Sequence, residues 1–185
     1  MPMDKTLQEQ RYCAFLRGVN VKGTNMKMGE VCSVFERSGV QDVSSVLASG
    51  NILFSSGKSR ATLKAQLEES MSSHFNYDAH LFLLSAQEVE VVVQQNPFDR
   101  TPDFHVYVFV GNPGIEDMLI TAYTATTAVE GEEVRKVGNR CYWKVPKGST
   151  LHSEFGKILG RKDLKSAFTS RNLNTFERLL KKLPL

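Results

Sequence analysis

The sequence lacks the segments that carry proteins into or across membranes. Met1 to Gln10 are mostly polar and carry both signs of charge, without the apolar stretch of a signal peptide. No run approaches the roughly 18 apolar residues that span a bilayer. The longest apolar run of interest, Val106 to Val110, has the length of a strand. We therefore predict a cytoplasmic protein with no membrane partner.

Cysteine and histidine are scarce and scattered. Cys13, Cys32 and Cys141 are far apart, form no CxxC pair and have apolar neighbours. We interpret them as buried, reduced thiols, which fits a reducing compartment. The four histidines show no HxxxH spacing. We accordingly expect no metal site and no cofactor.

Negative charge is scarce in the C-terminal third. Residues 1–133 contain 10 Lys/Arg and 17 Asp/Glu, a net charge of −7, whereas residues 134–185 contain 13 Lys/Arg and 3 Asp/Glu, a net charge of +10. Such a basic segment is typical of proteins that bind a phosphate, a nucleotide or a nucleic acid. The alternative, which we favour slightly, is that the basic third balances the acidic remainder of the same molecule.

The first half of the sequence predicts the order β-α-β-β-α-β, which is that of a ferredoxin-like unit. Apolar runs indicate the strands, and apolar residues at helical spacing indicate the helices. The predicted elements are a strand at Tyr12 to Leu16, a helix from Gly29 to a stop at Gly39, strands at Val43 to Leu47 and Ile52 to Ser55, a helix with Leu63, Leu67, Met71 and Phe75 on one face, and a strand at Ala79 to Leu84.

The second half predicts a near repeat, β-α-β-β-α-α, after a linking helix. The predicted elements are the linking helix opened by a capping box of Ser85 and Glu88, a strand at Phe104 to Val110, a helix with Asn112 as N-cap, a hairpin turning at Gly138-Asn139, a short helix with Leu151, Phe155, Ile158 and Leu159, and a last helix capped by Asn174. We predict an α+β fold of two packed ferredoxin-like lobes with mixed or antiparallel sheets, residues 1–84 and 85–185, the second ending in basic helices.

Arg17 to Asn25 is the strongest candidate binding motif. It leaves a predicted strand and opens a helix, so its backbone N–H groups and the positive end of the helix dipole suit an anion. Gly18 and Gly23 have the spacing of a P-loop, but Thr24-Asn25 stands where a P-loop has lysine before serine or threonine. That difference argues against nucleoside-triphosphate binding of this class. The alternative is a structural loop that uses glycine and asparagine for tight turns.

Two further polar motifs lie between predicted elements. Ser49-Gly50-Asn51 forms a turn between two strands, and no GxSxG pattern makes its serine a nucleophile. Thr169 to Thr175 opens the last helix with one arginine and more short polar side chains than a cap requires. This surplus indicates an anion site at the start of the helix, although capping by Asn174 alone is the simpler explanation.

These motifs together resemble one known family. Arg17-Gly18-Val19-Asn20-Val21 with Gly23 and Asn25, then Ser49-Gly50-Asn51, then Arg171-Asn172-Leu173-Asn174-Thr175 resemble the bacterial family called domain of unknown function 1697. The likeness extends from about Tyr12 to the last helix. It implies a compact α+β fold with ferredoxin-like character, and it implies no activity.

We predict that the protein binds a small anionic ligand bearing phosphate or carboxylate. Arginines would pair with the anion, and asparagine and serine side chains would orient it around one cleft. The predicted ligand-binding residues are Arg17, Asn20, Ser49, Asn51, Arg171, Asn172 and Asn174.

Two other classes of function stay open. The first is a nucleic-acid-binding module that uses the basic third, and we consider nucleic acid the less favoured partner. Arg140 to Lys144 contains aromatic residues but not the glycines of the RNP1 pattern. The second is a protein-interaction module without catalysis. The sequence specifies neither a reaction nor an oligomeric state.

Overall fold

The computed structural model describes residues 9–19 and 25–183, and their backbone forms eight strands, six α-helices and one short 3₁₀ helix. These residues fold into two compact units: the first comes from Met1–Val89 together with Leu179–Leu185, and the second from Glu90–Arg178. In chain order the elements are β1 (Gln10–Arg17), α1 (Met28–Arg37), β2 (Gln41–Ser45), β3 (Asn51–Ser56), α2 (Arg60–Phe75), β4 (His80–Ser85), α3 (Ala86–Gln94), β5 (Phe104–Gly111), α4 (Ile115–Thr124), β6 (Glu133–Val137), β7 (Arg140–Pro146), α5 (Glu154–Leu159), η1 (Lys162–Leu164), β8 (Phe168–Asn172) and α6 (Leu173–Leu180).

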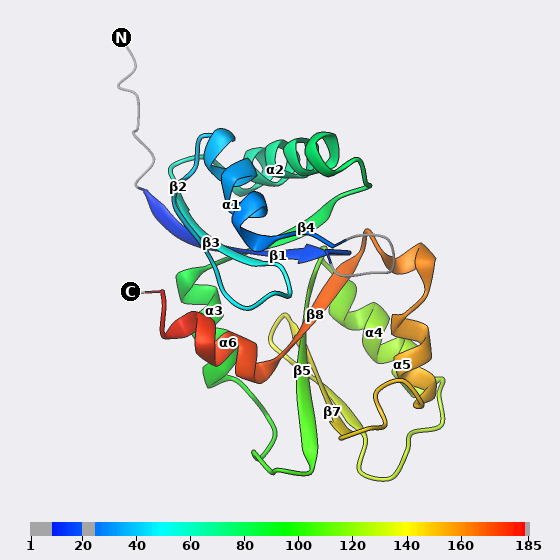
Figure 1. Cartoon of the computed structure of the whole chain (residues 1–185). Helices are drawn as coiled ribbons and strands as arrows, with labels where there is room; N and C mark the ends of the chain where they lie inside the picture. Colours follow the sequence, from blue (N-terminus) through cyan, green and yellow to red (C-terminus); the bar gives the residue numbers. More distant parts are fainter. Residues whose placement is uncertain (1–8, 20–24, 184–185) are drawn as a thin grey trace. The chain divides into compact units, whose positions relative to one another are not determined.

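The first unit is a four-stranded antiparallel sheet in the order β2-β3-β1-β4. Helices α1 and α2 lie side by side over one face of it (Figure 1). Leu63, Leu67 and Met71 recur every fourth residue of α2 and are fully buried in the core with Phe35 and Phe54. The helical spacing of apolar residues in the sequence therefore corresponds to the buried face of this helix.

The second unit repeats the same order of elements and the same sheet order, β6-β7-β5-β8, also antiparallel. Helices α4 and α5 belong to its core, in which Phe155 of α5 meets Phe109 of β5 and Trp143 of β7 edge to face. The predictions of an α+β chain and of two lobes are confirmed.

Two local predictions are confirmed at the level of hydrogen bonds and register. The backbone N–H of Glu88 donates to Ser85 Oγ over 3.2 Å, and the Ser85 N–H donates to Glu88 Oε2 over 2.8 Å, which completes the capping box of α3. The hairpin between β6 and β7 turns at Gly138, whose φ is 57°, and pairs Val137 with Arg140.

The predicted N-cap at Asn112 is wrong. Helix α4 begins at Ile115 after Gly114, which has a φ of 84°. Asn112 bonds instead to the segment just before β8. The Asn112 backbone N–H donates to Ala167 O over 2.9 Å, and the Asn112 side chain donates to Ser166 O over 3.1 Å. Gly114, in the left-handed region, stands between Asn112 and the first residue of the helix, so Asn112 is not the flanking residue that a cap requires.

Strand β8 was not predicted, so the order β-α-β-β-α-α expected for the second half is wrong at its end. Phe168–Asn172 pairs antiparallel with β5, at the edge of the sheet. Only Phe168 and Thr169 are buried in this strand, and its remaining residues are polar. An edge strand satisfies its backbone through one neighbour and needs few apolar side chains, so its sequence resembles a loop.

Two further predictions concern the burial of the cysteines and the membrane. Cys13 and Cys141 are buried and Cys32 is half-buried. Burial raises the pKa of Cys141 to about 12, so this thiol stays protonated. Among the helices of residues 9–19 and 25–183, none combines the length and the apolar character needed to cross a membrane.

Candidate functional site

In the first unit, the structure brings the Arg17 motif and the Ser49-Gly50-Asn51 turn together. The Leu16 N–H donates to Gly50 O over 2.8 Å. The Val19 side chain lies against Gly50 so closely that a Cβ on Gly50 would be 2.9 Å from Val19 Cγ2. The end of β1 and the β2–β3 turn thus form one cluster. Asn20 lies outside the described residues.

The Asn51 side chain holds the β2–β3 turn closed. It is fully buried, and its Nδ2 donates to Val46 O over 2.8 Å and to Ser49 Oγ over 2.9 Å. Both N–H bonds of this amide therefore have partners inside the turn. Arg17, at the end of β1, is half-buried, and burial places its pKa below the ordinary value of an arginine.

Arg171, Asn172 and Asn174 belong to the second unit, where they do not all face the same way. Asn172 pairs with Tyr107 and Arg171 pairs with Val108 in the antiparallel ladder, so the two side chains lie on opposite faces of the sheet. Arg171 Nη1 donates to Thr169 Oγ1 and to Ser170 O, over 2.8 and 2.9 Å. One cleft shared by all three motifs stays a prediction, because the motifs belong to two different units.

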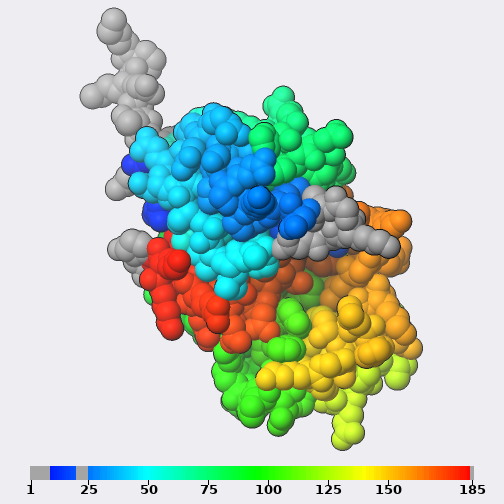
Figure 2. All heavy atoms as spheres, viewed as in Figure 1, coloured from blue at the N-terminus to red at the C-terminus, as the bar shows by residue number. Residues whose placement is uncertain are grey.

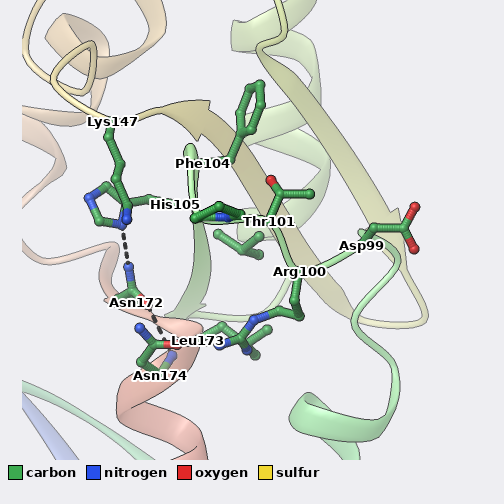
Figure 3. A pocket seen from close by; sticks show the side chains of 11 residues that line it. Asp99, Arg100, Thr101, Phe104, His105, Lys147, Asn172, Leu173 and Asn174 are labelled. Carbon is green, nitrogen blue, oxygen red and sulfur yellow. Dashed lines mark hydrogen bonds between the residues drawn. The ribbon is translucent and has the colours of Figure 1, made fainter.

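Asn172 and Asn174 line a pocket of about 290 Å³ in the second unit. Three chain segments meet there, and their colours adjoin on the face drawn in Figure 2: green near residue 100, gold near residue 147 and red-orange near residue 173. Figure 3 shows the side chains, from Asp99, Arg100, Thr101, Pro102, Phe104, His105, Val106, Lys147, Asn172, Leu173 and Asn174.

Asn172 connects the start of α6 to the imidazole of His105. The Asn174 backbone N–H can only donate, so Asn172 Oδ1 must be the acceptor of this 3.0 Å hydrogen bond. The amide nitrogen Nδ2 then faces His105 Nδ1 at 3.1 Å and donates to it. Because Nδ1 accepts, the neutral ring carries its proton on Nε2.

Arg100 fixes a second amide of the pocket. Its guanidinium pairs with Glu177 of α6, with Nη1 donating to Oε1 over 2.5 Å, and its Nη2 donates to Asn174 Oδ1. With Oδ1 engaged by a donor, the Nδ2 of Asn174 remains available. Lys147 Nζ has no carboxylate within salt-bridge distance and no hydrogen-bond partner among residues 9–19 and 25–183.

The predicted cap of the last helix is corrected by these contacts. Asn172 Oδ1 caps α6, whereas Asn174 lies inside the first turn of the helix. The reason is that α6 follows β8 directly, so the helix begins one residue before Asn174.

We expect Asn172→Ala to lower the free energy of unfolding by about 1 kcal/mol, the usual loss for a helix cap. Asn174→Ala should change it by no more than about 0.5 kcal/mol, because Asn174 is exposed. Urea denaturation of the two variants beside the wild type measures both values. A larger loss for Asn174→Ala than for Asn172→Ala would contradict the assignment of the cap.

Sequence reasoning missed Arg100, His105 and Lys147. Each is a single polar residue in a different local setting, and the three share no motif or spacing. The polar segment Asn172 to Asn174, which the sequence did single out, lines the same pocket but is far from all three in the sequence. Within the part of the chain that the structure describes, no group of three or more His, Cys, Asp or Glu side chains gathers in a way that would hold a metal ion.

Comparison with known families shows which family the chain belongs to. The family described as "Protein of unknown function (DUF1697)" matches residues 10–143, which is most of the chain. The protein belongs to this family. The suspected family is thereby confirmed; the match includes the first two motifs and ends before Arg171, and the family description assigns no activity.

A solved structure shares the fold of this DUF1697 protein. The conserved bacterial protein SP0830 from Streptococcus pneumoniae superimposes with a TM-score of 0.77 and 23% sequence identity, over 95% of this chain and 98% of that one. At this identity the likeness concerns the fold alone. The comparison with curated proteins gives no match.

Proposed function

We propose that this DUF1697 protein binds a small anionic ligand, bearing a phosphate or carboxylate group, in the pocket of its second unit. The observation that supports this proposal is the direction of the hydrogen bonds. The side-chain acceptors Asn172 Oδ1, His105 Nδ1 and Asn174 Oδ1 are all occupied by donors of the protein itself. The groups left over include several donors.

Three of the donors that remain on the pocket lining carry this proposal. They are the Lys147 ammonium, the Asn174 Nδ2–H and the Nε2–H of neutral His105. The Asp99 carboxylate also lines the pocket, but in Figure 3 it points away from the other labelled polar groups. A set of donors that includes an ammonium without a carboxylate in salt-bridge distance favours an oxyanion, since charge-assisted hydrogen bonds are about twice as strong as neutral ones.

This proposal keeps two of the residues predicted from the sequence, Asn172 and Asn174. A ligand role for Arg17, Asn20, Ser49, Asn51 and Arg171 remains a prediction. The nucleic-acid alternative loses one support, because the aromatic residues of β7 are buried: Trp143 is packed in the core of the second unit, and the Tyr142 hydroxyl donates to Val92 O. Base stacking needs an accessible ring face.

We expect Lys147→Met to weaken the binding of methylphosphonate and acetate about tenfold or more, because a hydrogen bond to a charged group contributes roughly 1.5–3 kcal/mol. Isothermal titration calorimetry of wild type and variant with each probe measures the change in Kd. Lys157→Met is the matched control: this lysine is exposed in α5 and does not line the pocket. Equal Kd values for wild type and Lys147→Met, or no binding of either probe to the wild type, would refute the proposal.

A further inference from the structure

A second pocket adjoins the first in the same unit. It has a volume of about 230 Å³ and shares Asp99, Thr101 and Phe104 with the first pocket. The Phe104 ring packs closely against Gly131, since a Cβ on Gly131 would lie 2.8 Å from Phe104 Cε1. The remaining lining residues are Pro97, Phe98, Arg135 and Lys144. The two pockets are thus neighbouring recesses that share part of their walls.

Two cations converge on this second pocket from adjacent strands. Arg135 of β6 and Lys144 of β7 lie over the ring of buried Phe98, with the guanidinium carbon at 4.8 Å and Nζ at 5.2 Å from its centroid. Attraction between a cation and the face of an aromatic ring holds both groups at this position. One carboxylate, besides that of Asp99 on the pocket wall, lies within salt-bridge distance of both cations.

That carboxylate is Glu133. It accepts a hydrogen bond from Arg135 Nε and lies 3.4 Å from Lys144 Nζ. Arg135 Nη1 donates to Pro97 O over 3.0 Å, which leaves Nη2 without a partner among the residues that the structure describes. The second pocket therefore also presents unused donors, on a wall that carries two cations, beside the donors of the first.

We propose that the second pocket is a second anion subsite, and that the ligand carries two anionic groups joined by a short spacer, with one group in each pocket. This inference rests on the proposed function for the first subsite. Phosphate and carboxylate share the chemistry that both subsites recognise. Phe104 and Thr101, which line both pockets, would contact the spacer. The ligand class is thus a bisphosphate, a phosphocarboxylate or a dicarboxylate.

The test compares methylphosphonate with alkylene bisphosphonates whose spacers range from one to five methylene groups. We expect one spacer length to bind the wild type at least about tenfold more tightly than methylphosphonate, because the second contact becomes intramolecular. A bisphosphonate that used only the first pocket would gain about twofold, since either of its two ends can bind there. Isothermal titration calorimetry gives each Kd.

The variants Lys144→Gln and Arg135→Gln test the assignment of the second subsite. Each should abolish the gain of the best bisphosphonate and leave the Kd of methylphosphonate within about twofold of the wild-type value. Lys136→Gln is the control, because Lys136 is on β6 but pairs with Asp117 and lines neither pocket. It should preserve the gain.

The outcomes separate the two proposals. If methylphosphonate binding depends on Lys147 but no spacer gains more than about twofold, the second subsite is refuted and the proposed function stands. A gain that persists in both Lys144→Gln and Arg135→Gln also refutes the second subsite. If methylphosphonate binding does not depend on Lys147, the proposed function and this inference both fail.

Discussion

Replacing Phe155 by alanine is expected to lower the free energy of unfolding of the second unit by about 3–5 kcal/mol, the usual cost of removing a buried phenyl ring. Phe155 is fully buried in α5, with ring centroids 5.4 Å from Tyr123, 5.4 Å from Trp143 and 6.2 Å from Phe109, all edge to face. The cavity would remove packing from one helix and two strands at once. Trp143 is the only tryptophan, so urea denaturation followed by its fluorescence reports on this unit.

Leu151→Ala supplies the control for the Phe155 prediction. Leu151 is 81% exposed and precedes α5, although its spacing in the sequence predicted a place on the apolar face of that helix. Its removal should change the free energy of unfolding by no more than about 0.5 kcal/mol. A Phe155→Ala variant as stable as Leu151→Ala would show that the aromatic cluster does not hold this unit together.

The Phe155 cluster also supports the second pocket. Trp143, which it contacts, donates from Nε1 to Glu132 Oε1 over 2.8 Å, and Glu132 immediately precedes β6. The residues next to these two are Glu133 and Lys144, which are paired across the two strands. Lys144 is one of the two cations of the second pocket, and Glu133 forms ion pairs with both. The spacing of the charged groups thus depends on buried apolar packing one residue away.

The sequence predicted best those elements whose apolar residues repeat with a clear period. Leu63, Leu67 and Met71 mark the buried face of α2, and the capping box of Ser85 and Glu88 marks the start of α3. Both signals are local, since helical periods and caps involve residues at most four positions apart. Local signals survive in a single sequence.

The sequence could not predict features that depend on contacts between distant segments. Strand β8 is polar, and its strand conformation comes from pairing with β5. Because this strand was not predicted, the cap of α6 was predicted at Asn174 and not at Asn172. The pocket has the same origin: His105 becomes part of it only because Asn172, far along the chain, pairs beside it and bonds to its ring. No spacing rule connects two such residues.

The glycine and asparagine of the Ser49-Gly50-Asn51 motif have structural roles in the first unit. The sequence singled out these residues as ligand-binding candidates, with a turn as the alternative. The buried amide of Asn51 bonds within the turn, and Gly50 permits the close approach of Val19. These contacts within the turn are thus a sufficient physical reason for both the glycine and the asparagine.

We expect Gly50→Ala to lower the stability of the first unit by about 2–5 kcal/mol. Gly50 has a φ of 77°, and an L-residue in this left-handed region costs roughly 1–2 kcal/mol. The added Cβ would also lie 2.9 Å from Val19 Cγ2 and 3.1 Å from Leu16 Cβ, and such overpacking typically costs a further 1–3 kcal/mol. Native-state hydrogen exchange of the β1 and β3 amides measures the loss in this unit, which lacks tryptophan.

Gly39→Ala separates the two contributions to the Gly50 effect. Gly39 has a φ of 80° in the same unit, but the nearest atom to an added Cβ is the flexible Lys58 Nζ at 4.0 Å. This control should therefore show the backbone cost alone, about 1–2 kcal/mol. Adding Val19→Ala to Gly50→Ala removes the closest clash, so the double variant should lose at least about 1 kcal/mol less than the sum of the single losses. If the losses of the two single variants added strictly, the residues at the end of β1 and in the β2–β3 turn would not be coupled energetically. The contact between the two motifs would then contribute nothing to stability.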